Sequence, residues 1–151
     1  MVPKGNPKQI RPSIDSLLRE DLDVVICNPE SGSIGRETKR ILDTAGLYEP
    51  VMQRAIYLTT DSRNLNTALK NGDADLILNW RATAFFDENI DTAEVLDLPP
   101  EQATPKKLVL NLLTFSAHPE LARYVMEVAS SERGQAIFRK HGFLDKQMRV
   151  D

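Results

Sequence analysis

The sequence predicts an α/β fold in which a mostly parallel sheet is flanked by helices on both faces. Two observations support this class. Short apolar runs rich in Val, Ile and Leu alternate along the chain with amphipathic runs of helical period, as in βα units. The turns between them carry small or helix-capping residues, which suit the change from strand to helix. At 151 residues the chain has the length of about one such domain.

The first half of the chain is predicted to alternate helical segments with two strands. A short helix at Ile14–Arg19, capped by Ser13, precedes an apolar strand at Leu22–Cys27, whose Val and Ile content favours the extended conformation. A loop of small residues, Asn28–Gly35, leads to an amphipathic helix that stops at Gly46. The elements that follow are expected at Tyr48–Met52 (a turn of helix), Ala55–Leu58 (a strand) and Arg63–Lys70 (a helix stopped by Asn71 and Gly72).

The second half is predicted to add three strands and two closing helices. The strands are expected at Leu76–Trp80, Thr92–Leu98 and Lys107–Phe115, and the helices at Pro119–Ser130 and from Ser131 or Glu132 to Lys140. Lys107–Phe115 contains the longest apolar run of the chain and is expected to be a buried strand. Four apolar residues at helical spacing indicate the buried face of the first closing helix: Leu121, Tyr124, Val125 and Val128.

Composition argues against several classes of function. The 19 basic and 22 acidic residues leave a net charge of −3, which argues against nucleic-acid binding. No apolar run approaches the roughly 20 residues that a membrane-spanning helix needs. Cys27 is the single cysteine and is interpreted as a buried thiol, and the two histidines lack zinc-binding spacing, so no metal or other cofactor is expected. The chain carries no catalytic motif or acid/base pair and is not expected to be an enzyme.

The stretch Leu22–Leu42 carries the strongest sign of a binding site. Its loop leaves little side-chain bulk where the strand gives way to the helix. An anion can therefore approach the unpaired N–H groups at the positive end of the helix dipole. Two further strand ends, at Thr59–Ser62 and Asn79–Arg81, also present mainly hydrogen-bond donors, which suits an oxyanion better than a cation.

Each of these strand ends also has a purely structural interpretation. Small residues make tight turns, and the run Thr59–Ser62 is typical of a helix cap. Trp80, the single tryptophan, is typical of a core or rim anchor. The Arg81 guanidinium can pair with Asp87 or Glu88. The meeting of three donor-rich ends in space would favour the binding interpretation, and the sequence alone does not show such a meeting.

Four segments, taken in order, resemble a known family. They are VPKGNP at Val2–Pro7, the loop and helix of Asn28–Pro50, LKNGDADLILNW at Leu69–Trp80 and the helix pair of His118–Phe143. The set is similar to the periplasmic molybdate/tungstate-binding proteins, which are type II solute-binding proteins of ABC importers. The resemblance implies that residues 1–117 form the second ligand-binding lobe with its crossover segments. It also implies that residues 118–151 contain the closing helix pair, which in the family packs on the first lobe.

The resemblance also implies ligand contacts and a function. The contacts would fall at two helix starts and at one strand end: Ser33, Ile34, Gly35, Asp61, Ser62, Trp80 and Arg81. Trp80 stands where the family often has a tyrosine. The implied function is that of an extracytoplasmic solute-binding component of an ABC importer, periplasmic or lipid-anchored outside the cell. Such a component binds a small oxyanion, here molybdate- or tungstate-like, and contacts the membrane subunits of the transporter.

Since the family's first lobe precedes the segment matched by Val2–Pro7, two more expectations follow. Oxyanion binding by this chain is expected to be weak or undetectable, because each exposed helix-dipole contact contributes only about 0.3–1 kcal/mol. The closing helices, with Ile137 and Phe138, are expected to expose an apolar patch and to form a homodimer or exchange a strand or helix. The alternative functions are a ligand-sensing domain of a cytoplasmic transcriptional regulator and an enzyme working through Cys27.

Overall fold

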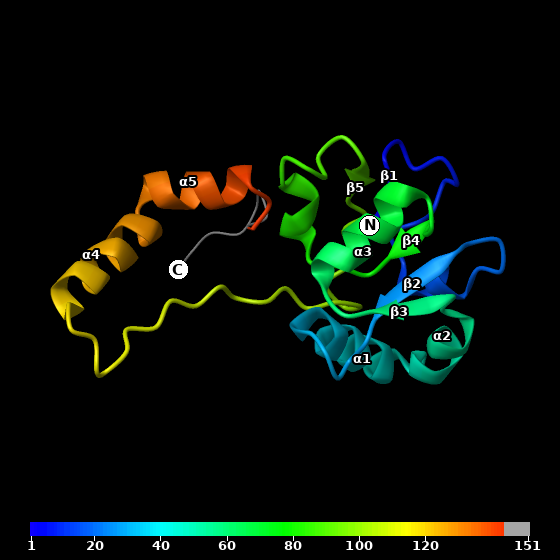
Figure 1. The fold of residues 1–151 in the computed structure, drawn as a ribbon, viewed down its shortest axis with the longest axis horizontal. Coiled ribbons are helices and arrows are strands. Elements are labelled where there is room, and N and C mark those ends of the chain that lie inside the picture. The colour runs from blue at the N-terminus through cyan, green and yellow to red at the C-terminus, as the bar shows by residue number, and fades with distance from the viewer. Residues whose placement is uncertain (144–151) are drawn as a thin grey trace. The chain divides into compact units, whose positions relative to one another are not determined.

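The computed structural model describes residues 1–143, which fall into two compact units, residues 1–104 and residues 105–143 (Figure 1). The boundary lies after Thr104, and the assignment of residues 1–117 and 118–151 to two lobes stays a prediction. The first unit contains β1 (Val2–Pro3), η1 (Ile14–Leu18), β2 (Val24–Cys27), α1 (Ser33–Ala45), α2 (Tyr48–Arg54), β3 (Tyr57–Thr59), α3 (Ser62–Asn71), β4 (Leu76–Ile77), η2 (Arg81–Phe85) and β5 (Ala93–Glu94); the second contains α4 (Pro119–Ser130) and α5 (Glu132–Lys140). The predicted α/β class is confirmed.

The main sheet is parallel, as predicted. Its strand order is β3-β2-β4, and both pairings of the central strand β2 are parallel. A separate antiparallel pair joins β1 to β5. Parallel strands joined by helices bring their carboxyl ends to one edge of the sheet, which is where α/β proteins bind ligands.

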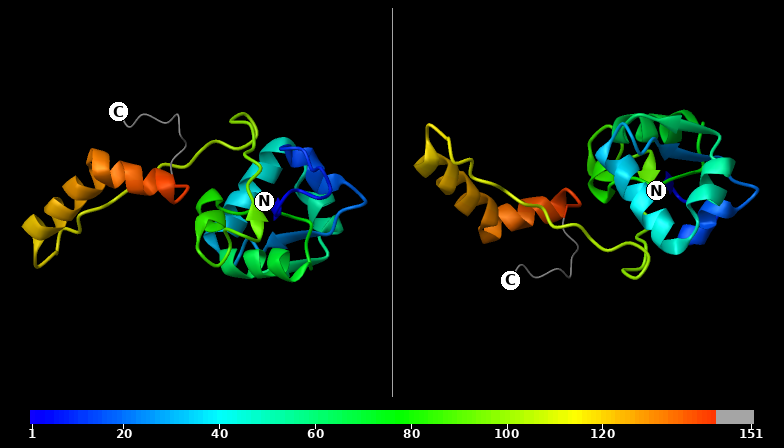
Figure 2. Two further views of the ribbon diagram at one scale, coloured as in Figure 1. Left: turned by 90° about the horizontal axis from the view of Figure 1, so that it is seen from above. Right: turned by 90° about the horizontal axis from the view of Figure 1, so that it is seen from below.

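Alternate residues of the strands build two cores on the two faces of the sheet. Val25, Cys27 and Ile77 pack in one cluster with residues of α3, whereas Val24 and Ile26 pack in another with residues of α1 and α2. The ribbon accordingly places α3 over one face, with α1 and α2 over the other (Figure 1, Figure 2). Because side chains alternate between the two faces of the sheet, both faces carry apolar residues that pack against helices.

Helix ends follow the predicted chemistry closely. Gly46 and Gly72 have φ of 69° and 81°, a left-handed conformation that glycine adopts without steric cost, and their N–H groups donate to carbonyls of the last turn. Ser13 and Asp61 cap the helical segments that follow them. The segment at Ile14–Leu18 is a 3-10 helix, so the predicted short helix exists but in its tighter form.

Two predicted strands are much shorter than expected. The strand predicted at Leu76–Trp80 ends at Ile77, because the Asn79 side chain draws the chain away from the ladder. Its Oδ1 accepts from the N–H of Trp80 (2.8 Å) and its Nδ2 donates to the Ser62 carbonyl (3.0 Å). The strand predicted at Thr92–Leu98 is only Ala93–Glu94, and the N–H groups of Thr92 and Ala93 instead donate to the Asn89 carbonyl in a turn.

The second unit departs most from expectation. Lys107–Phe115 forms no strand, and most of its apolar side chains are exposed rather than buried. The face predicted to be buried on α4 is also exposed, at 48–63% for Leu121, Tyr124, Val125 and Val128. The reason is size: two short helices can cover little of each other, and Gly134 and Gly142 are the buried residues among residues 105–143. α4 and α5 have the predicted bounds nonetheless.

Candidate functional site

The three strand ends singled out in the sequence meet at one edge of the sheet. The N–H of Asn28, after β2, donates to the Thr59 carbonyl at the end of β3 (2.8 Å). Ser31 Oγ, in the loop before α1, is 2.9 Å from the Thr60 carbonyl. The Asn79 amide, after β4, donates to the Ser62 carbonyl at the start of α3. The structure therefore supplies the spatial convergence that the sequence could not show.

The start of α1 is open toward this meeting point. Its N-cap is Gly32, and no side chain of residues 1–143 caps the helix. In the described part of the chain, the N–H groups of Ser33 and Ile34 have no hydrogen-bond acceptor. The Gly35 N–H is directed at the Cys27 sulfur. Unpaired N–H groups at the positive end of a 13-residue helix make a favourable position for an anion.

Close backbone packing explains the small residues of this loop. A Cβ at Gly35 would overlap the Asn28 carbonyl, and a Cβ at Gly32 would lie 3.0 Å from the Thr60 oxygen and 3.4 Å from Cys27 Sγ. The tight-turn interpretation is therefore correct for both glycines. The same packing leaves position 32 without a capping side chain, so the two interpretations of the loop are compatible.

The start of α3 differs because it is already capped. The Asp61 carboxylate accepts from the N–H groups of Arg63 and Asn64, both at 2.9 Å, as the helix-cap interpretation predicts. The Asp61 backbone also lies close to the loop, because its Cα is 3.8 Å from the position that a Cβ would take at Gly32. Ser62 is half-buried and offers its hydroxyl beside this cap.

Trp80 and Arg81 serve packing and pairing. Trp80 is partly buried against the core on the α3 side of the sheet, which fits its interpretation as an anchor. Arg81 Nε lies 3.0 Å from Asp97 Oδ1, and its guanidinium covers the Phe85 ring at 4.9 Å. The predicted partners Asp87 and Glu88 are replaced by Asp97, which lies farther along the chain.

Sequence reasoning missed the asparagine pair that holds the third strand end. The Asn79 amide nitrogen also lies 3.0 Å from Oδ1 of Asn66, which is buried on α3. A buried amide must find partners, so this pair fixes the end of β4 against the first turns of α3. A polar residue on the otherwise apolar face of a helix, as Asn66 is, was the available signal.

Cys27 lies under the loop as a buried thiol, as predicted. Burial raises the pKa of this thiol, and hydrogen bonds from Ser31, Gly35 and Thr59 oppose that rise without overcoming it. The thiol therefore stays protonated at neutral pH. A protonated, enclosed sulfur is a poor nucleophile, which weighs against chemistry through Cys27.

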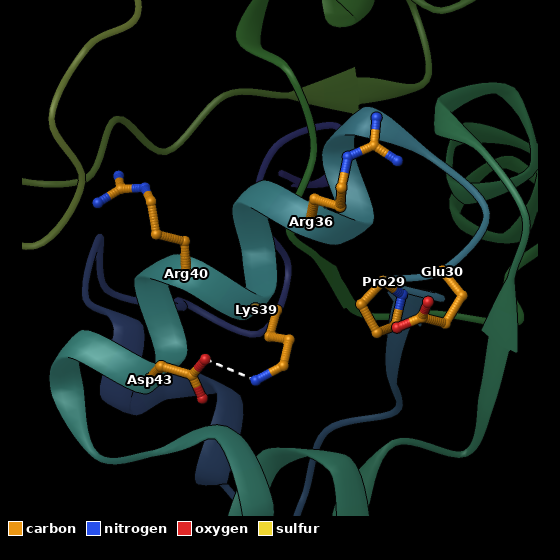
Figure 3. Close-up of a pocket in the computed structure, with 6 residues that line it drawn as sticks. All are labelled: Pro29, Glu30, Arg36, Lys39, Arg40 and Asp43. Atoms are coloured by element: carbon orange, nitrogen blue, oxygen red, sulfur yellow. Dashed lines mark hydrogen bonds and ion pairs between the residues drawn. The ribbon is translucent and has the colours of Figure 1, made fainter.

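A shallow surface hollow of about 330 Å³ lies beside α1 (Figure 3). Its charged side chains are mostly paired: Lys39 with Asp43 at 2.6 Å, and Arg40 with Glu37 at 2.6 Å. Figure 3 shows Arg36 pointing away from the other lining side chains. A hollow with both signs of charge has no strong preference for an anion. Residues 1–143 contain no group of three metal-ligating side chains.

No helix of the described chain has the length and apolar character needed to cross a membrane.

Several solved structures share the fold. L-phospholactate-bound PEB3, a protein also solved from Campylobacter jejuni, aligns with a TM-score of 0.63 and 13% identity over 94% of this chain and 62% of its own. A domain from Clostridium difficile, described as the substrate-binding domain of a putative molybdenum ABC transporter, aligns with a TM-score of 0.58 and 14% identity over 85% of this chain and 56% of its own. A periplasmic thiamin-binding protein aligns with a TM-score of 0.66 and 15% identity over 99% of this chain and 50% of its own.

These likenesses establish the fold and not the ligand, because identity is 15% or lower in all three. The chain spans about half to three-fifths of the length of these structures. Comparison with curated protein sequences gives no match. The family described as bacterial extracellular solute-binding protein matches residues 1–144, and the chain therefore belongs to this family of extracellular solute-binding proteins.

Proposed function

We propose that this chain is part of a solute-binding component of an ABC importer and that it holds a small oxyanion at the start of α1. The observation that carries the proposal is the uncapped N-terminus of α1 at the meeting point of three strand ends. Its free N–H groups, on Ser33 and Ile34, are the principal contacts. Backbone donors are suited to an anion of any shape, so the ligand is defined here as a class.

The remaining contacts come from the rim of the same edge. The Ser62 hydroxyl and the Trp80 indole N–H are neutral donors, whereas Gly35 permits close approach of the loop. Arg81 supplies positive charge that Asp97 partly neutralises. Asp61 disfavours anion binding nearby, because its carboxylate caps α3 and repels negative charge. We therefore assign Asp61 to the wall of the site.

The three structural neighbours suggest two classes of ligand, an anion and a cation. PEB3 was solved with L-phospholactate, and the Clostridium difficile protein is described as part of a putative molybdenum transporter, which favours an anion. The third neighbour binds thiamin, which carries a positive charge. The donor-rich edge of this chain favours the first two over the third. Only a few helix-dipole contacts contribute to the free energy of anion binding at this edge, so we expect a Kd of about 1 mM or weaker.

Titration followed by backbone amide NMR tests the proposal. Molybdate, tungstate, phosphate, L-phospholactate and thiamin are added separately to the 15N-labelled chain. We expect the amides of Ser33, Ile34 and Gly35 to shift with the anions and not with thiamin. The capped start of α3, at Arg63 and Asn64, is the matched control within the same molecule. Shifts with thiamin alone, or shifts confined to the hollow beside α1, would contradict the assignment.

The cellular role follows from the family and is a proposal for this chain. The family is extracellular, which favours the periplasm or a lipid anchor on the outer side of the membrane and does not favour a cytoplasmic regulator. It is also a family of binding proteins, in line with a non-enzymatic role. The partners would be the membrane subunits of the importer. Fractionation of cells that express the complete gene tests the location, and recovery in the cytoplasm would overturn it.

A further inference from the structure

β3 is an edge strand with an open, apolar side. In the order β3-β2-β4 it has, among residues 1–143, a neighbouring strand on one side only. The Ile56 N–H donates to the Val24 carbonyl (3.0 Å), so the backbone groups of Tyr57, the next residue, are directed to the open edge. Ile56, Tyr57 and Leu58 are 50%, 42% and 43% exposed. An edge of this kind, with no charge or proline on the strand, is a template for another strand.

The edge is apolar on both faces of the sheet. Tyr57 pairs with Val25, whose side chain packs on the α3 side, whereas Leu58 pairs with Ile26 on the α1 and α2 side. A shallow hollow of about 330 Å³ runs from β3 along α3, and it is lined by Tyr57, Leu58, Thr59, Thr60, Asn64, Thr67, Ala68 and Asp73. A strand added here must therefore be apolar on both of its faces.

The segment Lys107–Phe115 has this pattern and lacks a partner strand within the described part of its own unit. Leu108 and Leu110 would point to one face of an extended chain, and Val109 and Leu113 to the other. Most of its apolar residues are 52–81% exposed, namely Leu108, Val109, Leu110, Leu113 and Phe115, whereas Leu112 is partly buried. It carries no proline and no acidic residue, and its composition predicts a strand.

We propose that Lys107–Phe115 of one copy adds to the open edge of β3 in a second copy as a fourth, parallel strand. A second copy is the occupant because the chain itself provides an unpaired edge and a matching unpaired segment. Reciprocal exchange pairs both edges and closes a two-fold dimer. The proposal does not depend on ligand binding at α1.

Charge fixes the direction of the added strand. α3 runs back along the sheet, so Asp73, just after its C-terminus, lines the hollow at the end where β3 begins. Lys107 precedes the apolar run, and a parallel strand brings its ammonium group to the Asp73 end. An exposed ion pair of this kind contributes modestly to affinity but defines orientation.

Disulfide trapping tests the proposed pairing. In a Cys27→Ala background, Leu58→Cys and Leu110→Cys proteins are mixed under mild oxidation. We expect cross-linked heterodimers from the mixture and few cross-links from either protein alone. A chain that carries both cysteines and closes the disulfide within itself would overturn the second-copy assignment. Homodimers formed by Leu110→Cys alone would overturn the pairing with β3.

Proline substitution tests the strand itself. Leu110 lies outside every helix and strand, so Leu110→Pro leaves the rest of the fold unchanged, as circular dichroism can verify. Analytical ultracentrifugation is expected to show a dimer for the wild type and for the control Leu110→Val. Leu110→Pro is expected to be a monomer because it removes a backbone donor. A monomeric wild type at high concentration, or a dimeric proline variant, overturns the proposal.

Charge exchange tests the direction. Lys107→Glu is expected to raise the dimer Kd about two- to fivefold, as for an exposed ion pair. Adding Asp73→Lys in the same chain is expected to restore it. No restoration would overturn the parallel arrangement.

Discussion

The two units of this chain use similar sequence patterns and obtain very different structures from them. In the first unit, apolar residues of alternate and helical period are buried in two cores that sandwich a parallel sheet. In the second, an equally regular apolar face on α4 is 48–63% exposed. The difference lies in what each pattern can pack against. Periodicity specifies which face is apolar, whereas burial depends on whether the rest of the fold supplies a partner.

The largest expected difference between the units concerns core truncation. Ile26 is fully buried on the central strand, and Ile26→Ala should lower the free energy of unfolding by about 2–5 kcal/mol. Leu121→Ala on α4 should change it by about 0.5 kcal/mol or less, because that side chain is 62% exposed. Urea denaturation of both variants at low protein concentration provides the measurement. Equal losses would mean that the second unit has a core.

The N-terminus provides a second contrast, in pH dependence. Burial lowers the pKa of the Met1 amino group to about 5, and this group donates to the Ile77 carbonyl (2.7 Å). An unfolded amine binds its proton at a pKa near 8.0, so the unfolded state holds more protons between pH 5 and 8. Stability of the first unit should therefore rise with pH over that range, by up to about 4 kcal/mol.

Denaturation at pH 5, 6.5 and 8 measures this slope on protein whose intact mass confirms that Met1 is retained. Residues added before Met1 convert the amine to an amide and should flatten the dependence. α-Helical signal from α4 and α5 should show no matching change. A flat profile for the unextended chain would contradict the assigned burial.

Two glycines with crowded surroundings, one in each unit, allow the stabilities of the two units to be compared. Alanine at Gly35 would overlap the Asn28 carbonyl, and alanine at Gly134 would overlap the carbonyls of Val128 and Ala129. We expect Gly35→Ala to destabilise the first unit by about 1–3 kcal/mol, the usual range for overpacking. Gly134→Ala should change only the corner between α4 and α5. Denaturation followed by the single tryptophan, Trp80, distinguishes the two because it reports on the first unit.

Helix caps give a smaller effect. Asp61→Ala removes two capping hydrogen bonds from α3 and should cost about 1 kcal/mol, whereas Asp61→Asn retains the cap. Ser131 caps α5 through the Gly134 N–H at 3.2 Å. Ser131→Ala should leave the global free energy of unfolding almost unchanged and lower helicity locally. Thermal melts combined with circular dichroism test all three variants.

The smallest expected effect is on ligand affinity. Because Asp61→Asn removes a negative charge from the wall of the proposed site and keeps the cap, anion affinity should rise several-fold, by less than about 1 kcal/mol. The amide titration described above measures it. An unchanged affinity would place the anion away from Asp61.

Much of the fold was predictable because local chemistry decides it. Gly46 and Gly72 end helices through backbone conformation, and Ser13 and Asp61 start them through their own side chains. The end of β4 was not predictable, since it depends on Asn79 reaching a carbonyl 17 residues away. The prediction of a strand at Lys107–Phe115 was wrong for a different reason. The local propensity of this segment for the extended conformation is clear, but a strand forms only where a partner strand is available.

The candidate site was predictable in part. The uncapped start of α1 follows from the small residues of its own loop, Asn28–Gly35, which the sequence singled out; the contacts at Ser33, Ile34 and Gly35 were implied by the family resemblance. The Arg81–Asp97 ion pair and the pairing of Asn79 with Asn66 depend on contacts distant in sequence, so sequence reasoning reached neither. Ligand binding by any of these residues stays a prediction.

The glycine at position 32 has a consequence for how this site can change over generations. Serine or aspartate at this position would cap α1 and occupy the anion position, and either is a small mutational step from glycine. The Thr60 carbonyl, 3.0 Å from where the new Cβ would lie, penalises both steps. The backbone just after β3 thus disfavours a capping side chain at position 32 and helps to keep the proposed site uncapped. A side chain at position 32 therefore requires the Thr60 carbonyl, just after β3, to give way by a few tenths of an ångström.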